Sequence, residues 1–157
     1  MQTVTYPITI YYDASCPLCR HEIDLLKQFD TASQIALVDC SPQTYQGEGE
    51  HSRAAMMQLI HAKDASGQWL IGAPVFAAAY AATGFSAIAR LWGARWLQPF
   101  WRVAYPVIAN NRMLLSKLGV MAAMTKILHW FHARSAQTAL ANSAQCQNDA
   151  CDSTRKK

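Results

Sequence analysis

Two cysteines three residues apart are the side chains in this sequence best suited to redox chemistry. Cys16 and Cys19 stand in "YYDASCPLCRH", directly after a run of strand-forming residues and at the start of an expected helix. The backbone N–H groups and the positive dipole end of a helix N-terminus stabilise a thiolate on the first sulfur. The second sulfur, about one turn further along, can close a disulfide with the first. The spacing therefore predicts a dithiol centre, with Cys16 as nucleophile and Cys19 as resolving cysteine.

A carboxylate precedes the pair, and further residues are expected to support it. Asp13 ends the expected strand, where it could cap the turn by accepting backbone N–H groups or exchange a proton with Cys19 through water. The sequence leaves both roles open. For His61, a structural role in its own strand competes with a supporting role at the site. The expected supporting residues are Pro17, which restrains the turn, Arg20, which adds positive potential, Met57 and His61.

A zinc site is the main competing interpretation, because zinc uses the same cysteine spacing. Such a site usually needs a second ligand pair, and the other closely spaced cysteines are Cys146 and Cys151, in a stretch without large hydrophobic residues. Cys40 is interpreted as a small buried hydrophobic residue. We therefore expect neither a metal nor a cofactor beyond the cysteines themselves.

The elements expected around the pair resemble the order of a thioredoxin-like fold. A strand, an amphipathic crossover helix and a second strand within about thirty residues form a βαβ unit with parallel strands. The helix is expected to place Ile23 and Leu26 on its apolar face and Glu22 on the opposite, polar face. A hairpin then adds antiparallel strands. The sequence therefore predicts an α/β, thioredoxin-like fold with a mixed four-stranded sheet flanked by helices and a helical C-terminal extension. The expected elements are strands at 8–12 and 35–40 with a helix from 17 between them, a loop at 41–50, a short helix after Ser52, a hairpin over 59–71 and a helix over 73–84.

Charge is distributed unevenly along the chain. Residues 1–79 carry four Lys/Arg and eight Asp/Glu, whereas residues 80–157 carry ten and two. Residues 90–112 interleave tryptophan with arginine, a combination that suits a peripheral membrane contact but also suits helix packing beneath a solvated basic face. No nucleic-acid-binding motif accompanies these residues, so no nucleic-acid partner is expected.

The length of 157 residues suits one domain with additions. We expect a thioredoxin-like domain over 1–112, a helical extension over 113–135 and a disordered tail over 136–157. The N-terminus has no secretory signal pattern, and the uncharged stretch 65–89 contains three glycines and a proline, unlike a membrane-spanning helix. A cytoplasmic location is expected, where a close cysteine pair is more often catalytic or metal-binding than a structural disulfide.

The residues around the pair also resemble a known family. Asp13, Cys16 and Cys19 form the Asp-x-x-Cys-x-x-Cys signature of the DCC family of thiol-disulfide oxidoreductases, and residues 52–76 and 103–112 are similar to that family's hairpin region and closing segment. The resemblance covers residues 7–112. It implies a thioredoxin-like fold, dithiol chemistry with these three side chains at the site, and a protein or small-molecule disulfide or dithiol as substrate.

One departure from thioredoxin itself concerns substrate docking. Thioredoxins place a cis-proline just before the third strand, facing the cysteine pair, whereas Met56, Met57 and Gln58 occupy that approach here. The sequence therefore supports two functions. The first is a thiol-disulfide oxidoreductase, and the alternative is a non-catalytic thioredoxin-like binding or adaptor module that acts through the Trp/Arg-rich residues 90–112.

Overall fold

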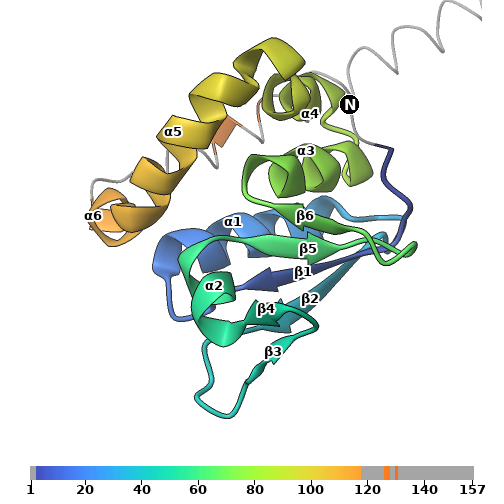
Figure 1. Cartoon of the computed structure of the whole chain (residues 1–157). Coiled ribbons are helices and arrows are strands. Elements are labelled where there is room, and N and C mark those ends of the chain that lie inside the picture. Colours follow the sequence, from blue (N-terminus) through green and yellow to red (C-terminus); the bar gives the residue numbers. More distant parts are fainter. Residues whose placement is uncertain (1–2, 118–125, 128–129, 131–157) are drawn as a thin grey trace, which may run out of the picture. The chain divides into compact units, whose positions relative to one another are not determined.

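A mixed four-stranded sheet forms the centre of the computed structural model, which describes residues 3–117, 126, 127 and 130 (Figure 1). Its strands lie in the order β2-β1-β5-β6. β1 pairs in parallel with β2 and antiparallel with β5, and β5 pairs antiparallel with β6. This arrangement confirms the predicted mixed α/β fold. The four strands are β1 (Ile8–Tyr12), β2 (Ile35–Asp39), β5 (His61–Lys63) and β6 (Trp69–Ile71).

Helices flank the sheet and continue beyond it. The first, α1, crosses from β1 to β2, and α3 follows the β5–β6 hairpin. Figure 1 shows α5 running from α4 to α6 beside this core. The helices are α1 (Pro17–Phe29), α2 (Arg53–Gln58), α3 (Ala73–Ala82), α4 (Ser86–Gly93), the 3-10 turn η1 (Arg95–Leu97), α5 (Gln98–Asn110) and α6 (Arg112–Lys117).

Local signals explain where α1 begins and ends. It begins at a proline, whose fixed φ suits a first helical turn. Its apolar face buries Ile23, Leu25 and Leu26. After the helix, the Asp30 carboxylate accepts the backbone N–H groups of Gln34 and Ile35 at 2.7 and 3.0 Å. These bonds fix the turn that leads into β2.

Alternation along β1 supplies core residues to both faces of the sheet. Ile8 and Ile10 are completely buried on one face. Tyr11 points to the opposite face, where it joins Cys40 and Met56 in a second buried cluster. The expected buried position of Cys40 is thus observed.

The segment between β2 and α2 differs from the prediction. A loop was expected over residues 41–50, but β3 (Gly47–Glu48) and β4 (His51–Ser52) form a small antiparallel hairpin at its end. Each strand is only two residues long and carries no apolar alternation, so the periodicity that marks longer strands is missing. Ser52 still caps α2 as expected, because its hydroxyl accepts the Ala55 N–H at 3.3 Å.

The C-terminal helices contact the core through aromatic side chains, because Phe76 of α3 packs against Trp92 of α4 and Tyr105 of α5, with ring centroids 5.0 and 5.8 Å apart. Trp92 of α4 stacks on Trp101 of α5 at 4.2 Å between ring centroids. α6 packs against α1. Within the described residues, every helix is too short or too polar to cross a membrane.

The predicted boundaries at residues 112 and 135 stay predictions. Most of the predicted helical extension, 113–135, and all of the predicted tail, 136–157, lie outside the described residues, as do Cys146 and Cys151.

Candidate active site

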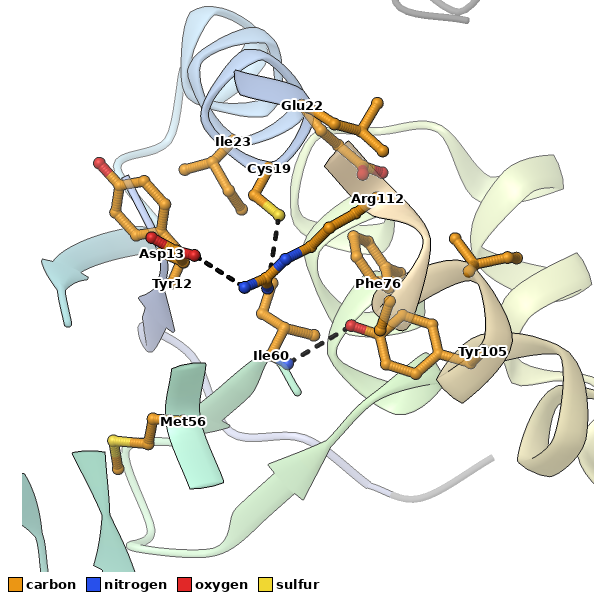
Figure 2. A pocket seen from close by; sticks show the side chains of 13 residues that line it. Tyr12, Asp13, Cys19, Glu22, Ile23, Met56, Ile60, Phe76, Tyr105 and Arg112 are labelled. Carbon is orange, nitrogen blue, oxygen red and sulfur yellow. Dashed lines mark hydrogen bonds and ion pairs between the residues drawn. The ribbon is translucent and has the colours of Figure 1, made fainter. Parts of the chain in front are cut away.

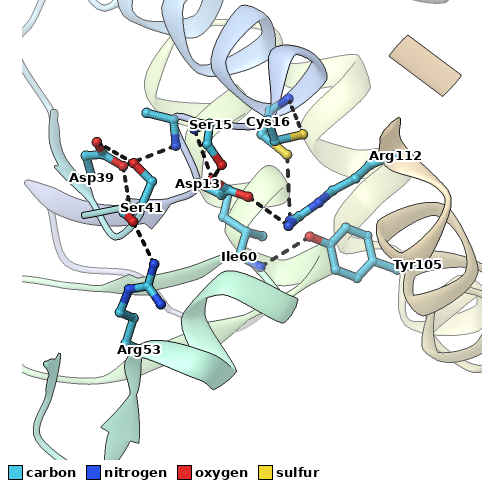
Figure 3. Close-up of polar contacts among 11 residues, drawn as sticks. Asp13, Ser15, Cys16, Asp39, Ser41, Arg53, Ile60, Tyr105 and Arg112 are labelled. Atoms are coloured by element: carbon cyan, nitrogen blue, oxygen red, sulfur yellow. Dashed lines mark hydrogen bonds and ion pairs between the residues drawn. The ribbon is translucent and has the colours of Figure 1, made fainter. Parts of the chain in front are cut away.

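Cys16 occupies the N-cap position of α1. Its Sγ accepts the backbone N–H of Cys19 at 3.3 Å, and its carbonyl accepts the N–H of Arg20 at 2.9 Å. Only 1% of Cys16 is exposed. The hydrogen bond and the helix dipole both favour negative charge on this sulfur. Both cysteines are free thiols, and Figure 3 shows Cys16 at the start of α1.

Cys19 is the more accessible of the two sulfurs and faces a different set of groups. Burial and the neighbouring Cys16 raise the pKa of the Cys19 thiol, and the guanidinium of Arg112 opposes that shift. Arg112 Nη1 lies 4.0 Å from Cys19 Sγ. A cation at this distance stabilises a thiolate on Cys19.

Asp13 links the turn before α1 to a distant part of the chain. One carboxylate oxygen accepts the Ser15 N–H at 3.0 Å and the Ser15 hydroxyl at 2.5 Å. The other oxygen accepts a 2.8 Å hydrogen bond from Arg112 Nη2 (Figure 3). Asp13 is 5% exposed, so this is a largely buried ion pair. Both carboxylate oxygens are therefore engaged.

A small cavity of about 60 Å³ lies beside Cys19 (Figure 2). Its wall is mostly apolar, and its polar groups include the Asp13–Arg112 pair and the Glu22 carboxylate. Residues from α5 and α6 close one side of it. The lining comprises Tyr12, Asp13, Leu18, Cys19, Glu22, Ile23, Met56, Ile60, Phe76, Tyr105, Ile108, Ala109 and Arg112.

This dithiol site lies within a segment that matches a known family. Residues 10–118 match the DCC1-like thiol-disulfide oxidoreductase family. The chain belongs to this family. No curated protein and no solved structure matches the chain. Membership of the DCC1-like family supports a redox role and a thiol or disulfide as substrate.

Two of the four predicted supporting residues lie on α1 of this DCC1-like domain. Pro17 is the first residue of the helix. Arg20 is exposed and lies 3.7 Å from Asp24 on the next turn. Both residues therefore stand at the dithiol end of the helix, but neither lines the cavity.

The other two predicted supporting residues lie away from the cavity. Met57 packs against the Tyr11 cluster. His61 is 2% exposed, its Nδ1 lies 2.9 Å from the Leu59 carbonyl oxygen, and burial lowers its pKa. Met56 and Ile60 line the cavity instead. Because β5 begins at His61, Ile60 directly precedes that strand.

Sequence reasoning missed three groups at the site of this DCC1-like chain. Arg112 and Tyr105 come from the Trp/Arg-rich residues 90–112, which were interpreted as a membrane contact or as helix packing and not as part of the site. Glu22 was assigned to the polar outer face of α1, but it lines the cavity. The spacing of Glu22 from Cys19 was the available signal, since residues three apart share a helix face. The described residues hold no group of three or more His, Cys, Asp or Glu side chains that could bind a metal.

Proposed function

We propose that this protein is a thiol-disulfide oxidoreductase in which Cys16 is the nucleophile and Cys19 the resolving cysteine. The observation that carries the proposal is the position of Cys16 Sγ at the N-cap of α1, 3.3 Å from the Cys19 backbone nitrogen. A thiolate at that point is stabilised by a hydrogen bond and by the helix dipole. Family membership supports the same class of reaction.

The reaction follows the usual two exchanges. The Cys16 thiolate attacks one sulfur of a substrate disulfide, the substrate S–S bond breaks, and one substrate thiolate leaves. Cys19 then attacks Cys16 Sγ, which forms the Cys16–Cys19 disulfide and releases the second substrate thiolate. Two electrons thus pass from the dithiol to the substrate. Since only 1% of Cys16 is exposed, the first attack requires a local opening of the site.

The neighbouring residues have supporting roles in this proposal. Asp13 holds the turn before α1 through Ser15 and positions Arg112 beside Cys19. Pro17 fixes the first helical turn, and Arg20 adds positive charge at the same end of the helix. Met57 and His61 act indirectly, through the packing of α2 and β5.

The first test is a thiol-trapping titration across a series of redox buffers, followed by alkylation and peptide mass spectrometry. We expect Cys16 and Cys19 to oxidise together as a linked two-electron pair. Cys19→Ser should accumulate a mixed disulfide on Cys16, and Cys16→Ser should abolish exchange. The matched control is the Cys146→Ser/Cys151→Ser double variant, which should titrate like the native chain.

Two results would contradict the proposal. If Cys16→Ser retains exchange and traps substrate on Cys19, the two roles are reversed. If the pair does not oxidise and a metal is released on acidification, the cysteines are ligands. We propose a cytoplasmic location for this reaction, in which the Cys16–Cys19 dithiol donates two electrons or its disulfide accepts them, according to the reduction potential of the pair.

A second candidate function is a peripheral contact with an anionic membrane. Large apolar side chains at helical spacing on η1 and α5 are each 57% or more exposed. They are Trp96, Phe100, Val103 and Val107. The sequence from residue 65 to residue 148 contains no Asp or Glu, whereas residues 90–112 carry four arginines, of which Arg112 is paired with Asp13. Apolar side chains flanked by cations bind best to a surface that offers hydrocarbon beneath negative headgroups.

Vesicle flotation tests this second function. We expect the protein to float with phosphatidylserine-containing vesicles at low salt, and to float less at high salt or with purely zwitterionic vesicles. Phe100→Ser should reduce flotation. Ile71→Ser is the matched control, because Ile71 is 41% exposed but lies on β6. Protein that stays at the bottom at both salt concentrations, or that loses flotation equally with Ile71→Ser, would argue against the contact.

A further inference from the structure

Glu22 is a titratable group at the site that the disulfide exchange described above does not use. It lies three residues after Cys19 on α1, and residues at this spacing have Cβ atoms about 5–6 Å apart on one helix face. Both side chains line the cavity beside Cys19 (Figure 2). A single water needs roughly 10–15 Å³, so a cavity of about 60 Å³ has room for water between them.

The groups that face Glu22 come from several elements. From α3, the Tyr80 hydroxyl donates a hydrogen bond to Glu22 Oε1 at 3.2 Å. Tyr105 of α5 and Arg112 of α6 line the same cavity, as does Asp13 from the end of β1. The positive charge of Arg112 is already paired with Asp13 at 2.8 Å. Glu22 therefore has a hydrogen-bond donor, but among the described residues it forms no ion pair with a cation.

This environment suits a group that exchanges protons near neutral pH. Burial raises the pKa of Glu22 to about 7, and the hydrogen bond from Tyr80 partly offsets the rise. At pH 7, a carboxyl group with such a pKa is protonated and ionised in comparable proportions. This is the condition for an efficient general acid or general base.

Cys19 needs a proton acceptor at this point in the structure. Burial and Cys16 raise the pKa of the Cys19 thiol, so the protonated form predominates until the thiol attacks. Asp13 is the other nearby carboxylate, but its two oxygens are engaged by Ser15 and Arg112. Glu22 is thus the carboxylate of this cavity with capacity to accept a proton.

We propose that Glu22 takes the proton of Cys19 during resolution, directly or through a water in the cavity, a role that rests on the oxidoreductase function proposed above. In the mixed disulfide, the Cys19 thiol gives its proton to the Glu22 carboxylate and its sulfur attacks Cys16 Sγ. The Cys16–Cys19 bond forms, the Cys16–substrate bond breaks, and the electron pair leaves on the substrate thiolate. In the reverse direction Glu22 returns the proton as Cys19 leaves.

The test separates the two exchange steps. A mixed disulfide is preformed on Cys16 with a chromophoric aromatic thiol, and the release of that thiol is followed by stopped flow from pH 5 to pH 10. We expect native release to rise with pH through an inflection near pH 7. Glu22→Gln should lose that inflection and slow release at pH 7 by roughly 100-fold, the usual contribution of a general base. Asp24→Asn, a surface carboxylate on the same helix, should behave like the native chain.

A second variant keeps the carboxylate and moves its titration. Tyr80→Phe removes the hydrogen bond that favours the ionised form of Glu22, so the inflection should move to higher pH. A purely structural role for Glu22 would not produce such a shift. This variant also keeps the proposal testable if Glu22→Gln does not fold.

The outcomes distinguish this proposal from the function on which it rests. If the mixed disulfide forms and resolves in Glu22→Gln with the native pH profile, or if Tyr80→Phe leaves the inflection unmoved, Glu22 is not the acceptor although the oxidoreductase function stands. If neither Cys19→Ser nor Cys16→Ser traps substrate as a mixed disulfide, the oxidoreductase function itself is wrong.

Discussion

The ionisation of Cys19 depends on groups that lie far apart in the sequence. Burial and Cys16 raise the pKa of its thiol, and Arg112, 93 residues away, opposes that effect from 4.0 Å. The thiol that we propose as the resolving cysteine is therefore more protonated than a free thiol, and its reactivity depends on nearby groups that can accept its proton or stabilise its negative charge.

Replacing Arg112 should make Cys19 harder to ionise. In a Cys16→Ser background, Arg112→Met should move the pH midpoint of Cys19 alkylation upward, because the opposing cation is lost. Alkylation followed by peptide mass spectrometry measures this midpoint. Arg112→Lys keeps the positive charge and should bring the midpoint most of the way back to its native value. Arg102 is an exposed arginine on α5, and Arg102→Met should leave the midpoint unchanged. A midpoint that is the same with methionine and lysine would show that the charge does not act on Cys19.

At the level of single residues, sequence reasoning could find what is local. Cys16, Cys19 and Asp13 were recognised because they stand within seven positions and their spacing relative to a strand and a helix carries the chemistry. Arg112 could not be found in this way, because its contact with Asp13 spans 99 residues. Glu22 was assigned to the wrong face of α1 because the cavity that receives it is formed by helices from elsewhere in the chain.

At the level of elements, the turn between β5 and β6 depends on one carboxylate. Asp64 is 5% exposed and accepts backbone N–H groups from Thr5, Ser66 and Gln68 at 2.9–3.0 Å. The Ser66 hydroxyl also donates to it at 2.6 Å. The turn that closes the hairpin is therefore tied to the chain that enters β1.

These hydrogen bonds predict a specific dependence of stability on pH. Led by the Ser66 hydroxyl, they lower the pKa of Asp64 to about 2. A carboxyl whose pKa is lowered by folding stabilises the protein above its unfolded pKa of about 3.9, and that contribution is lost as the pH falls toward 2. Asp64→Asn should therefore be less stable than the native chain at pH 6, with a difference that shrinks between pH 4 and pH 2.

Urea unfolding at each pH measures this difference. Asp24→Asn is the control, because the Asp24 side chain is 54% exposed and its replacement should leave the curve unchanged. A constant difference between Asp64→Asn and the native chain from pH 6 to pH 2 would mean that the ionisation of Asp64 does not support the turn.

The elements themselves could be predicted where a period or a cap was present. Alternating or helical spacing of apolar residues predicts β1, α1 and β2, and Pro17 marks the start of α1. The turn residues at 64–67 predict the β5–β6 hairpin. The β3–β4 hairpin could not be predicted, because a strand of two residues has no period to read. Its turn requires backbone at positive φ, as at Gly49 with φ +61°, which the sequence signals only as a glycine.

At the level of the whole molecule, two long-range contacts hold α5 and α6 beside the dithiol. Arg112 of α6 bonds to Asp13, and the Tyr105 hydroxyl of α5 accepts the backbone N–H of Ile60 at 3.4 Å. Neither contact has a local signal, which is why the placement of these helices could not be derived from the sequence. The two helices form one wall of the cavity that Cys19 also lines.

Opening of this wall should control access to Cys19. Tyr105→Phe removes the hydrogen bond to Ile60 without changing the ring, and such a bond contributes about 1 kcal/mol. If α5 and α6 open locally, the variant should raise the population of the open form, and the rate of Cys19 alkylation, by about fivefold. Tyr6→Phe is a closely matched control, because the Tyr6 hydroxyl donates to the Ala78 carbonyl at 2.9 Å and Tyr6 is not part of that wall. Equal acceleration in both variants would mean that Cys19 is reached through global unfolding, whereas acceleration in Tyr105→Phe alone would identify α5 and α6 as the part of the fold that opens to expose Cys19.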